Sequence, residues 1–383
     1  MKNLLIISYS PLNRDPRIQR QIKTFQDSFN IETIGLTFAN ETILNHTAKY
    51  GKVSEKKVTL QKAFIIIKML FGNYKELLYH WYLKPLYDYS YKRPDLIIAN
   101  DWMGLYSACN LNEHFKWNAK IYFDSHEYFP KYRTSLYWKI REKPMIYYAF
   151  RSCRDKFDIM STVCPSLARM YEKFFHFEPN TVRVITNAPD YEQDLEPNPV
   201  KEKIRIIHHG LVSYVRQMEK MVDIMDYLPE DKYELYFMLV LGEKDYYNQL
   251  IQRAAKHNNI HFLPPVPFAQ IPSFINQFDI GLFILNNDLI SYKYALPNKF
   301  FEFVQARLAI AIGDSFEMKQ YVKKYDLGIA ADENSAEALA KEIIKLSKDD
   351  IMRYKQNAHK YARELSAETN MVELRKIADE LLR

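Results

Sequence analysis

The segment Tyr292–Arg307 carries residue types that could bind a nucleoside diphosphate. Pro297 suits the first turn of a helix, because a residue there needs no N–H for the helical hydrogen bonds. The free N–H groups that follow, from Asn298 onward, would attract an anion, and Lys299 adds a positive charge in the same turn. Glu302 lies about one turn along the same face, where its carboxylate could accept both hydroxyls of a ribose. The alternative is an amphipathic helix on which Lys299 and Glu302 form a solvated pair.

A second candidate site for a diphosphate follows the strand-like run Ile204–His208. Gly210 would let the backbone approach a ligand closely, because glycine has no side chain. Arg216 comes six residues later and could meet a diphosphate with its planar guanidinium. The alternative is a turn glycine followed by a surface arginine.

Candidate catalytic residues follow two strand-like runs of the N-terminal half. His126 stands between Asp124 and Glu127 after the run Lys120–Asp124, and Asp101 follows the run DLIIAN. A histidine at such a place could donate a hydrogen bond to a sugar hydroxyl or a phosphate, and the carboxylates could orient it or act as a base. The alternative is a loop histidine that only satisfies local hydrogen bonds.

Basic and aromatic residues alternate in residues 49–93 and 136–154. This mixture suits an anionic membrane interface, where aromatic rings lie at the depth of the headgroups. Nucleic-acid binding and a packed pair of helices are the alternatives, and we expect no nucleic-acid partner. The predicted membrane or acceptor face comprises Arg14, Arg17, Lys68, Trp81, Tyr82, Lys84, Trp138 and Arg141.

The elements that must position these residues alternate between strand-like and helix-like runs along the whole chain. This pattern predicts an α/β protein with two Rossmann-like, doubly wound domains that face a cleft, with ligands at the carboxyl ends of the strands. We expect an N-terminal, acceptor-binding domain over 1–190, a linker over 191–203 and a C-terminal, nucleotide-binding domain over 204–365. Residues 366–383 form a last helix that could pack back on the N-terminal domain.

Composition excludes several other classes of protein. The chain has nine glycines, none closer than fifteen positions to another, so neither a dinucleotide-binding glycine motif nor a P-loop is present. No two aspartates stand two apart, and the three cysteines are widely spaced, so we expect no metal site, no disulfide framework and no cofactor. The longest apolar run, Leu235–Leu241, is far shorter than a membrane span. Residues 1–150 carry 22 Lys and Arg against 13 Asp and Glu, which favours an anionic partner for this half.

The order and spacing of these segments resemble the GT-B glycosyltransferases, specifically the family 4-like group that builds bacterial surface polysaccharides. The segments that carry the resemblance are SPLNRDPRIQRQIKTF, FDSHE, VRVITNAPD, HHGLVSYVRQMEKMVDIM and LPNKFFEFVQARLAIAIGD. The resemblance implies a transferase that moves a sugar from a nucleotide-sugar donor, such as a UDP-sugar, to a glycan or polyprenyl-linked acceptor. It also implies retention of the anomeric configuration, catalysis without a metal, and a cytoplasmic location on the inner face of the plasma membrane.

The same resemblance suggests roles for individual residues. His126 would contact the donor sugar, Arg216 and Lys299 the diphosphate, and Glu302 the ribose. Many members carry a glutamate for the donor sugar eight positions before the ribose-binding one, and this position is Tyr294 here. We therefore assign Tyr294 and Pro297 to the donor sugar, while a further departure from the family pattern is Leu211, often arginine. A sugar-nucleotide epimerase on the same fold and a non-catalytic partner in a polysaccharide assembly complex are the rival hypotheses.

Overall fold

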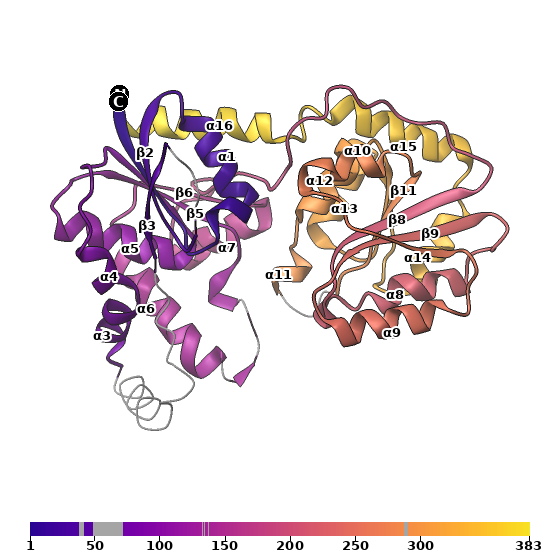
Figure 1. Cartoon of the computed structure of the whole chain (residues 1–383), viewed down its shortest axis with the longest axis horizontal. Helices are drawn as coiled ribbons and strands as arrows, with labels where there is room; N and C mark the ends of the chain where they lie inside the picture. The colour runs from indigo at the N-terminus through magenta and orange to yellow at the C-terminus, as the bar shows by residue number, and fades with distance from the viewer. Residues whose placement is uncertain (38–41, 49–71, 132, 134, 137, 287–289) are drawn as a thin grey trace. The chain divides into compact units, whose positions relative to one another are not determined.

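The computed structural model describes residues 1–37, 42–48, 72–131, 133, 135–136, 138–286 and 290–383. The chain divides into two units, and each is built around one sheet. Unit 1 comprises Met1–Ile185 with Met371–Arg383, and unit 2 comprises Thr186–Asn370 (Figure 1). Every strand pair between the described residues is parallel, which confirms the predicted class of two doubly wound α/β domains.

The sheet of unit 1 has seven strands in the order β3-β2-β1-β4-β5-β6-β7. They are β1 (Lys2–Ile7), β2 (Phe29–Gly35), β3 (Leu44–Thr47), β4 (Leu96–Asn100), β5 (Lys120–Ser125), β6 (Ile159–Thr162) and β7 (Arg183–Val184). All five residues of β4 are buried, as expected of a central parallel strand that is covered on both faces. Strand-like runs over 4–8, 31–36, 95–99, 120–124, 158–163 and 182–186 predict every strand of this sheet except β3, whose residues Leu-Asn-His-Thr lack an apolar alternation.

Helices cover both faces of this sheet. They are α1 (Pro16–Phe25), α3 (Tyr74–Leu78), α4 (Lys84–Tyr87), α5 (Asp101–His114), α6 (Lys143–Cys153) and α7 (Pro165–Phe175). Helix α1 begins later than predicted because Asp15 caps it, accepting hydrogen bonds from the backbone N–H groups of Arg17 (3.1 Å) and Ile18 (3.4 Å). Arg17, in the first turn of α1, reaches Asp124 near the carboxyl end of β5.

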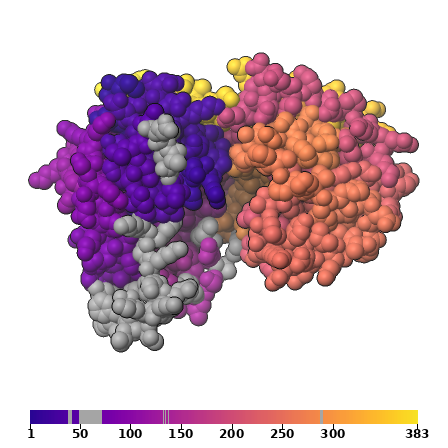
Figure 2. All heavy atoms as spheres, in the orientation of Figure 1, coloured from indigo at the N-terminus to yellow at the C-terminus, as the bar shows by residue number. Residues whose placement is uncertain are grey.

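The C-terminal residues belong to the core of unit 1. Leu374, Ile377 and Ala378 of α16 (Ala367–Leu381) are buried in one apolar cluster with residues of β1, α1 and β4. Lys2 Nζ donates to the carbonyl of Leu382 at 2.9 Å, and the yellow C-terminal atoms lie against the indigo N-terminal ones (Figure 2). The two ends of the chain are therefore folded together in one unit.

Unit 2 contains a six-stranded sheet in the order β10-β9-β8-β11-β12-β13. Its strands are β8 (Ile204–Leu211), β9 (Tyr233–Val240), β10 (Ile260–Leu263), β11 (Ile280–Phe283), β12 (Ala309–Ile312) and β13 (Gly328–Ala330). Its helices are α8 (Glu219–Val222), α9 (Lys244–Ala254), α10 (Ile271–Ile275), α11 (Ile290–Lys293), α12 (Asn298–Gln305), α13 (Phe316–Tyr325), α14 (Ala336–Ile344) and α15 (Lys348–Tyr361). Strand-like runs over 204–208, 234–241, 260–263, 280–285, 308–312 and 327–331 predict all six strands of this unit.

The residues expected to form a linker are tied into unit 2. The buried guanidinium of Arg307 donates to the carbonyls of Leu195 (3.1 Å) and Glu192 (2.5 Å). The backbone N–H of Tyr191 donates to Glu368 Oε2 at 2.9 Å. These bonds give residues 191–196 fixed partners within the unit.

Helix α12 lies close against the sheet. A Cβ on Gly281 of β11 would lie 2.4 Å from Cγ of Phe303, so only glycine lets the ring of this helix residue approach the strand. Phe303 itself is fully buried. This close packing holds α12 against β11.

Candidate functional site

Two cationic side chains converge on Gly210 at the carboxyl end of β8. The φ angle of Gly210 is +135°, which favours glycine. A Cβ at this position would lie 3.0 Å from Lys299 Nζ and 3.5 Å from Arg216 Nη1. The structure thus brings together three residues that the sequence assigned to a diphosphate from two separate segments.

Lys299 is buried. Its ammonium group lies 4.3 Å from the ring centroid of Phe283 and 3.4 Å from His208 Nε2. Burial and the positive charge of Arg216 lower the pKa of Lys299 well below its usual value, against the opposing effect of Glu302. An anion bound beside these two cations would relieve their repulsion, which is the electrostatic character of a phosphate site.

Arg216 is held in place by its own main chain. Nη1 donates to the carbonyl of Leu211 at 3.1 Å, and burial lowers the pKa of the guanidinium. Arg216 ends a 3-10 turn (Tyr214–Arg216), and helix α8 begins only at Glu219. The sequence places a helix start near Arg216, but the helix begins later and the arginine lies in the preceding turn.

Glu302 lies one turn after Lys299 on α12, and both side chains are enclosed. Lys299 is 7% exposed and Glu302 is 3% exposed, so they do not form the solvated surface pair that was the alternative hypothesis. Glu302 Oε2 lies 3.3 Å from Nε2 of His209. A buried carboxylate beside a cationic site remains a suitable acceptor for hydroxyl groups.

The start of α12 is one residue later than predicted. Pro297 occupies the N-cap position, with extended backbone, and Asn298 is the first helical residue. Tyr294 lies in the preceding segment, half-buried, with its ring edge-to-face against Phe316 at 5.4 Å. Tyr294, Pro297 and Asn298 thus stand at the same helix start, and the assignment of the first two to a donor sugar stays a prediction.

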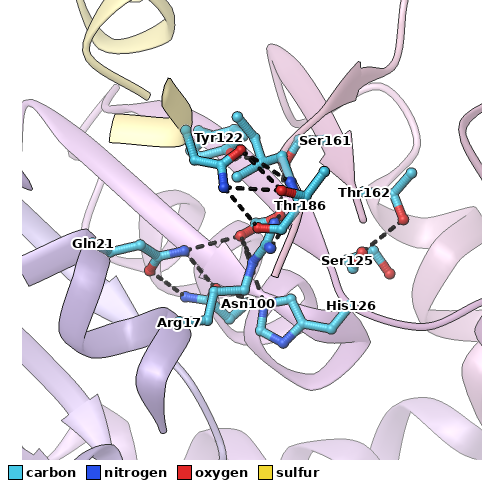
Figure 3. A network of polar contacts seen from close by, with 12 residues as sticks. Arg17, Gln21, Asn100, Tyr122, Ser125, His126, Ser161, Thr162 and Thr186 are labelled. Atoms are coloured by element: carbon cyan, nitrogen blue, oxygen red, sulfur yellow. Dashed lines mark hydrogen bonds and ion pairs between the residues drawn. The ribbon is translucent and has the colours of Figure 1, made fainter. Parts of the chain in front are cut away.

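A second cluster in unit 1 centres on Asp124 near the end of β5. Figure 3 shows Arg17, Gln21, Asn100 and His126 gathered at this site. Arg17 donates through Nε to Oδ2 at 2.7 Å and through Nη2 to Oδ1 at 2.6 Å. Gln21 Nε2 (3.0 Å) and Ser161 Oγ (2.6 Å) also donate to this carboxylate. Burial alone would raise the pKa of Asp124, but Arg17 and the hydrogen bonds from His126 and Arg17 hold it well below its usual value.

This arrangement corrects two predictions. Asp124 is fully buried and its oxygens accept from four donors, so it does not serve as a catalytic base. Arg17 is 5% exposed and its remaining Nη1 donates to the carbonyl of Ile185 at 2.8 Å, so it does not lie on a membrane or acceptor face. The pair is a structural ion pair that supports the neighbouring histidine.

His126 has an oxygen near each ring nitrogen. Nε2 lies 3.2 Å from Asn100 Oδ1 and 3.6 Å from Asp124 Oδ2, and Nδ1 lies 3.6 Å from Asp101 Oδ2. Burial would lower the pKa of His126, but Asp101 and the hydrogen bond to Asp124 raise it overall. The side chain is 19% exposed, so the ring can present a positive charge and an N–H donor to a ligand.

Asp101 adopts a left-handed backbone conformation, with φ of +57°, at the start of α5. This conformation aims its carboxylate at the His126 main chain, whose N–H donates to Oδ1 at 2.9 Å. Desolvation raises the pKa of Asp101 even though 27% of its side chain stays exposed. Glu127 is half-buried, and its main-chain carbonyl accepts from Tyr171 Oη at 2.6 Å.

Five residues that sequence reasoning did not assign take part in these clusters. Gln21 and Asn100 exchange two amide hydrogen bonds, at 2.8 and 3.0 Å, and Asn100 Oδ1 also lies within hydrogen-bond distance of His126 Nε2. Ser161 donates to Asp124. Gln21 lies four residues after Arg17, on the same face of α1, which is the one local indication of a shared role. In unit 2 the additional residues are His208 and His209.

The predicted membrane face is mostly not a surface. Tyr82 and Trp138 are buried, and Trp81 and Arg141 are half-buried, with the guanidinium of Arg141 5.8 Å from the indole centroid. The prediction is therefore wrong for Tyr82 and Trp138, because the rings of these two residues are buried in unit 1. It is also wrong for Arg17, which is buried against Asp124. Arg14 and Lys84 are exposed, whereas Lys68 lies outside the described residues.

Residues 190–365 match the family model described as "Glycosyl transferases group 1". The matched segment contains the Gly210, Arg216, Lys299 and Glu302 cluster. This part of the chain is a glycosyltransferase domain. No curated protein sequence matches the chain significantly.

Solved structures with the GT-B fold resemble the whole chain. Sucrose-phosphate synthase from Thermosynechococcus elongatus has 11% identity and a TM-score of 0.72, over 100% of this chain and 99% of that one. HepE from Anabaena, solved in complex with UDP, has 13% identity and a TM-score of 0.70, over 99% of this chain and 100% of that one. WaaG, a glycosyltransferase involved in lipopolysaccharide biosynthesis, has 11% identity and a TM-score of 0.66, over 98% and 99% of the two chains. The chain therefore has the GT-B fold.

Among the helices that the structure describes, none is long and apolar enough to cross a bilayer. In the same part of the chain, no three His, Cys, Asp or Glu side chains gather as a set of metal ligands.

Proposed function

We propose that this glycosyltransferase belongs to the family 4-like group and transfers a sugar from a nucleoside-diphosphate donor, a UDP-sugar. The observation that carries the proposal is the convergence of Arg216 and Lys299 on Gly210, with the Glu302 carboxylate one helical turn away. The two cations can bind a diphosphate, which can also approach the backbone closely at Gly210 because this residue has no side chain. The buried carboxylate of Glu302 can accept hydrogen bonds from the two ribose hydroxyls. HepE, which was solved with UDP and with UDP-glucose, supports the choice of uridine.

In the proposed reaction the cations stabilise the leaving diphosphate. As the bond between the anomeric carbon and the diphosphate oxygen breaks, negative charge grows on that oxygen, beside Arg216 and Lys299. Fixed positive groups in a buried site stabilise such charge strongly without having to reorganise. We therefore assign to these side chains the role that a metal ion takes in other transferases. We also propose that the anomeric configuration of the transferred sugar is retained.

Unit 1 is proposed to bind a glycan or a polyprenyl-linked acceptor in surface-polysaccharide synthesis. His126 would donate a hydrogen bond to the transferred sugar through Nδ1, which lies 3.6 Å from Asp101 Oδ2, whereas Nε2 faces Asn100. Peripheral association with the inner face of the plasma membrane is retained as part of the proposal. The buried aromatic residues do not support this membrane association. Its support comes from Leu136 and Ile140, which are 72% and 58% exposed, and from the exposed Lys139 near them.

Calorimetric titration of UDP and GDP into the purified chain tests the donor site. We expect UDP to bind, Lys299→Met to weaken it about 10- to 100-fold, and Glu302→Gln to weaken it about tenfold, since hydrogen bonds to charged groups are worth about 1.5–3 kcal/mol. Lys323→Met, which removes an exposed lysine of the same unit, is the matched control and should bind as the wild type does. Absence of binding by both nucleotides would contradict the proposal.

Turnover distinguishes the proposed reaction from its rivals. A transferase should release UDP from UDP-glucose or another UDP-sugar, slowly with water and faster when an acceptor is present. Interconversion of the nucleotide sugar with no acceptor would identify an epimerase instead, and binding without any turnover would indicate a non-catalytic partner.

A further inference from the structure

Two adjacent histidines at the end of β8 each contact a different side chain of α12. His208 Nε2 lies 3.4 Å from Lys299 Nζ, and His209 Nε2 lies 3.3 Å from Glu302 Oε2. All four side chains are buried. Successive residues of a strand point to opposite faces of the sheet, so the two histidine side chains diverge. They contact two different residues of α12, which lie one helical turn apart.

The hydrogen bonds of His208 define which nitrogen faces the lysine. Nδ1 lies 2.9 Å from the carbonyl oxygen of Leu282, and a carbonyl can only accept, so Nδ1 carries the proton. Burial and the charge of Lys299 lower the pKa of His208 well below its usual value, so the ring is neutral. Nε2 therefore presents a lone pair to the Lys299 ammonium group.

The ring of His208 is fixed by its neighbours. It stacks on Phe283, with ring centroids 5.8 Å apart and planes 12° apart, and meets Phe237 nearly edge-on. Phe283 also offers its face to Lys299 Nζ at 4.3 Å. The ammonium group is thus held between an aromatic face and a fixed acceptor, and is directed toward Gly210.

His209 has an unused donor position beside Glu302. Its Nε2 is buried and makes no hydrogen bond within the described residues, and the Glu302 oxygen at 3.3 Å lies within reach. Burial and Lys299 lower the pKa of His209, so the ring is neutral and can donate one N–H to the carboxylate. The ring edge rests on Phe303 of the same helix, with centroids 5.4 Å apart.

We propose that His208 positions Lys299 for the diphosphate and that His209 positions Glu302 for the ribose, so that neighbouring residues of one strand control two separate parts of nucleotide binding. The proposal rests on the proposed function of Lys299 and Glu302. If the histidines instead only fill the core, replacing either should weaken every ligand of the site equally.

Ligand fragments separate these two possibilities for His208. We expect His208→Phe to weaken UDP about three- to tenfold and to leave uridine, measured by NMR titration, unchanged, because uridine has no diphosphate for Lys299 to bind. His208→Gln offers a donor and an acceptor on one amide and should recover most of the affinity for UDP. Equal losses for UDP and uridine, or no recovery by glutamine, would overturn the role of His208.

The reciprocal pattern tests His209. We expect His209→Phe to weaken UDP and uridine by a similar factor, about three- to tenfold, and to leave 2′,3′-dideoxyuridine diphosphate unchanged, because that analogue lacks the diol. His209→Gln should restore much of the loss. A loss for the dideoxy analogue as large as that for UDP would overturn the role of His209.

The wild-type protein provides the reference for the proposed function. If wild type binds neither UDP nor GDP, the proposed function itself fails before any variant is compared. If GDP binds and UDP does not, the guanosine series of the same three ligands is used. If wild type binds and the variants lose all ligands equally, the proposed function stands and the positioning roles fail.

Discussion

Replacing Asp124 by asparagine should destabilise unit 1 strongly while leaving unit 2 folded. Asp124 is fully buried and accepts two hydrogen bonds from Arg17, whose side chain is 6% exposed. The substitution places a donor group against these donors and leaves the guanidinium without its counter-charge. Breaking a buried ion pair on one side typically costs about 3–5 kcal/mol.

The distribution of tryptophan makes this loss measurable for unit 1 alone. All four tryptophans, at positions 81, 102, 117 and 138, belong to unit 1. Urea unfolding followed by tryptophan fluorescence therefore reports on this unit. With a urea dependence of about 2.5 kcal/mol/M, a loss of about 3–5 kcal/mol lowers the midpoint by about 1–2 M.

Two controls test the reasoning behind this prediction. Glu113→Gln removes one partner of an exposed ion pair, Lys156 Nζ to Glu113 Oε2 at 2.6 Å, and should cost less than about 1 kcal/mol. Arg17→Met combined with Asp124→Asn should cost less than the sum of the single changes, because neither charge is then left alone. A midpoint shift for Asp124→Asn no larger than that of Glu113→Gln would refute the claim that this buried pair holds unit 1 together.

The stability of unit 1 should also fall as pH rises through the pKa of His126, which Asp101 raises against the effect of burial. A group whose pKa is higher in the folded than in the unfolded state contributes its full stability below about pH 6.5, and this contribution is lost as pH rises through the folded-state pKa. A urea midpoint, followed by fluorescence, that stays constant from about pH 6 to 9 would contradict this. Gly281→Ala should destabilise unit 2 by about 1–3 kcal/mol through overpacking, because the new Cβ would lie 2.4 Å from Cγ of Phe303. Calorimetry should show this as a lower melting temperature for unit 2, which has no tryptophan and is silent in tryptophan fluorescence; an unchanged transition would show that α12 can shift. Arg307→Met should destabilise unit 2 by about 3 kcal/mol or more, because the Arg307 guanidinium donates to four main-chain carbonyls. A loss of stability below about 1 kcal/mol by calorimetry would mean that water replaces those bonds.

Much of the fold could be predicted because buried parallel strands have a strong local pattern. Residues 96–99 and the run Ala309–Ile312 are apolar throughout and are flanked by helical periodicity. The short strand Leu44–Thr47 lacks that pattern, and its place at the edge of the sheet comes from pairing with β2. A strand defined by its partner rather than by its own residues cannot be recognised locally.

The candidate site was predictable only where its residues lie on one element. Lys299 and Glu302 are three positions apart on one helix, so their spacing alone indicated a shared face. Arg17 and Asp124 are 107 residues apart, and nothing in either segment indicated that they pair. Tyr82 and Trp138 were misplaced because aromatic residues among lysines and arginines have the same composition at a membrane interface and in a helix-packed core.

The sequence by itself determined the alternation of strands and helices, the absence of a glycine-rich phosphate loop, and the cation and carboxylate at the start of α12. Only the tertiary structure decided which charges meet: Arg216 and Lys299 at Gly210, Arg17 on Asp124, and one histidine beside each of Lys299 and Glu302. The physical reason is range. Hydrophobic periodicity and capping act within a few residues, whereas burial and charge pairing depend on distances through space that the order of the strands in each sheet creates.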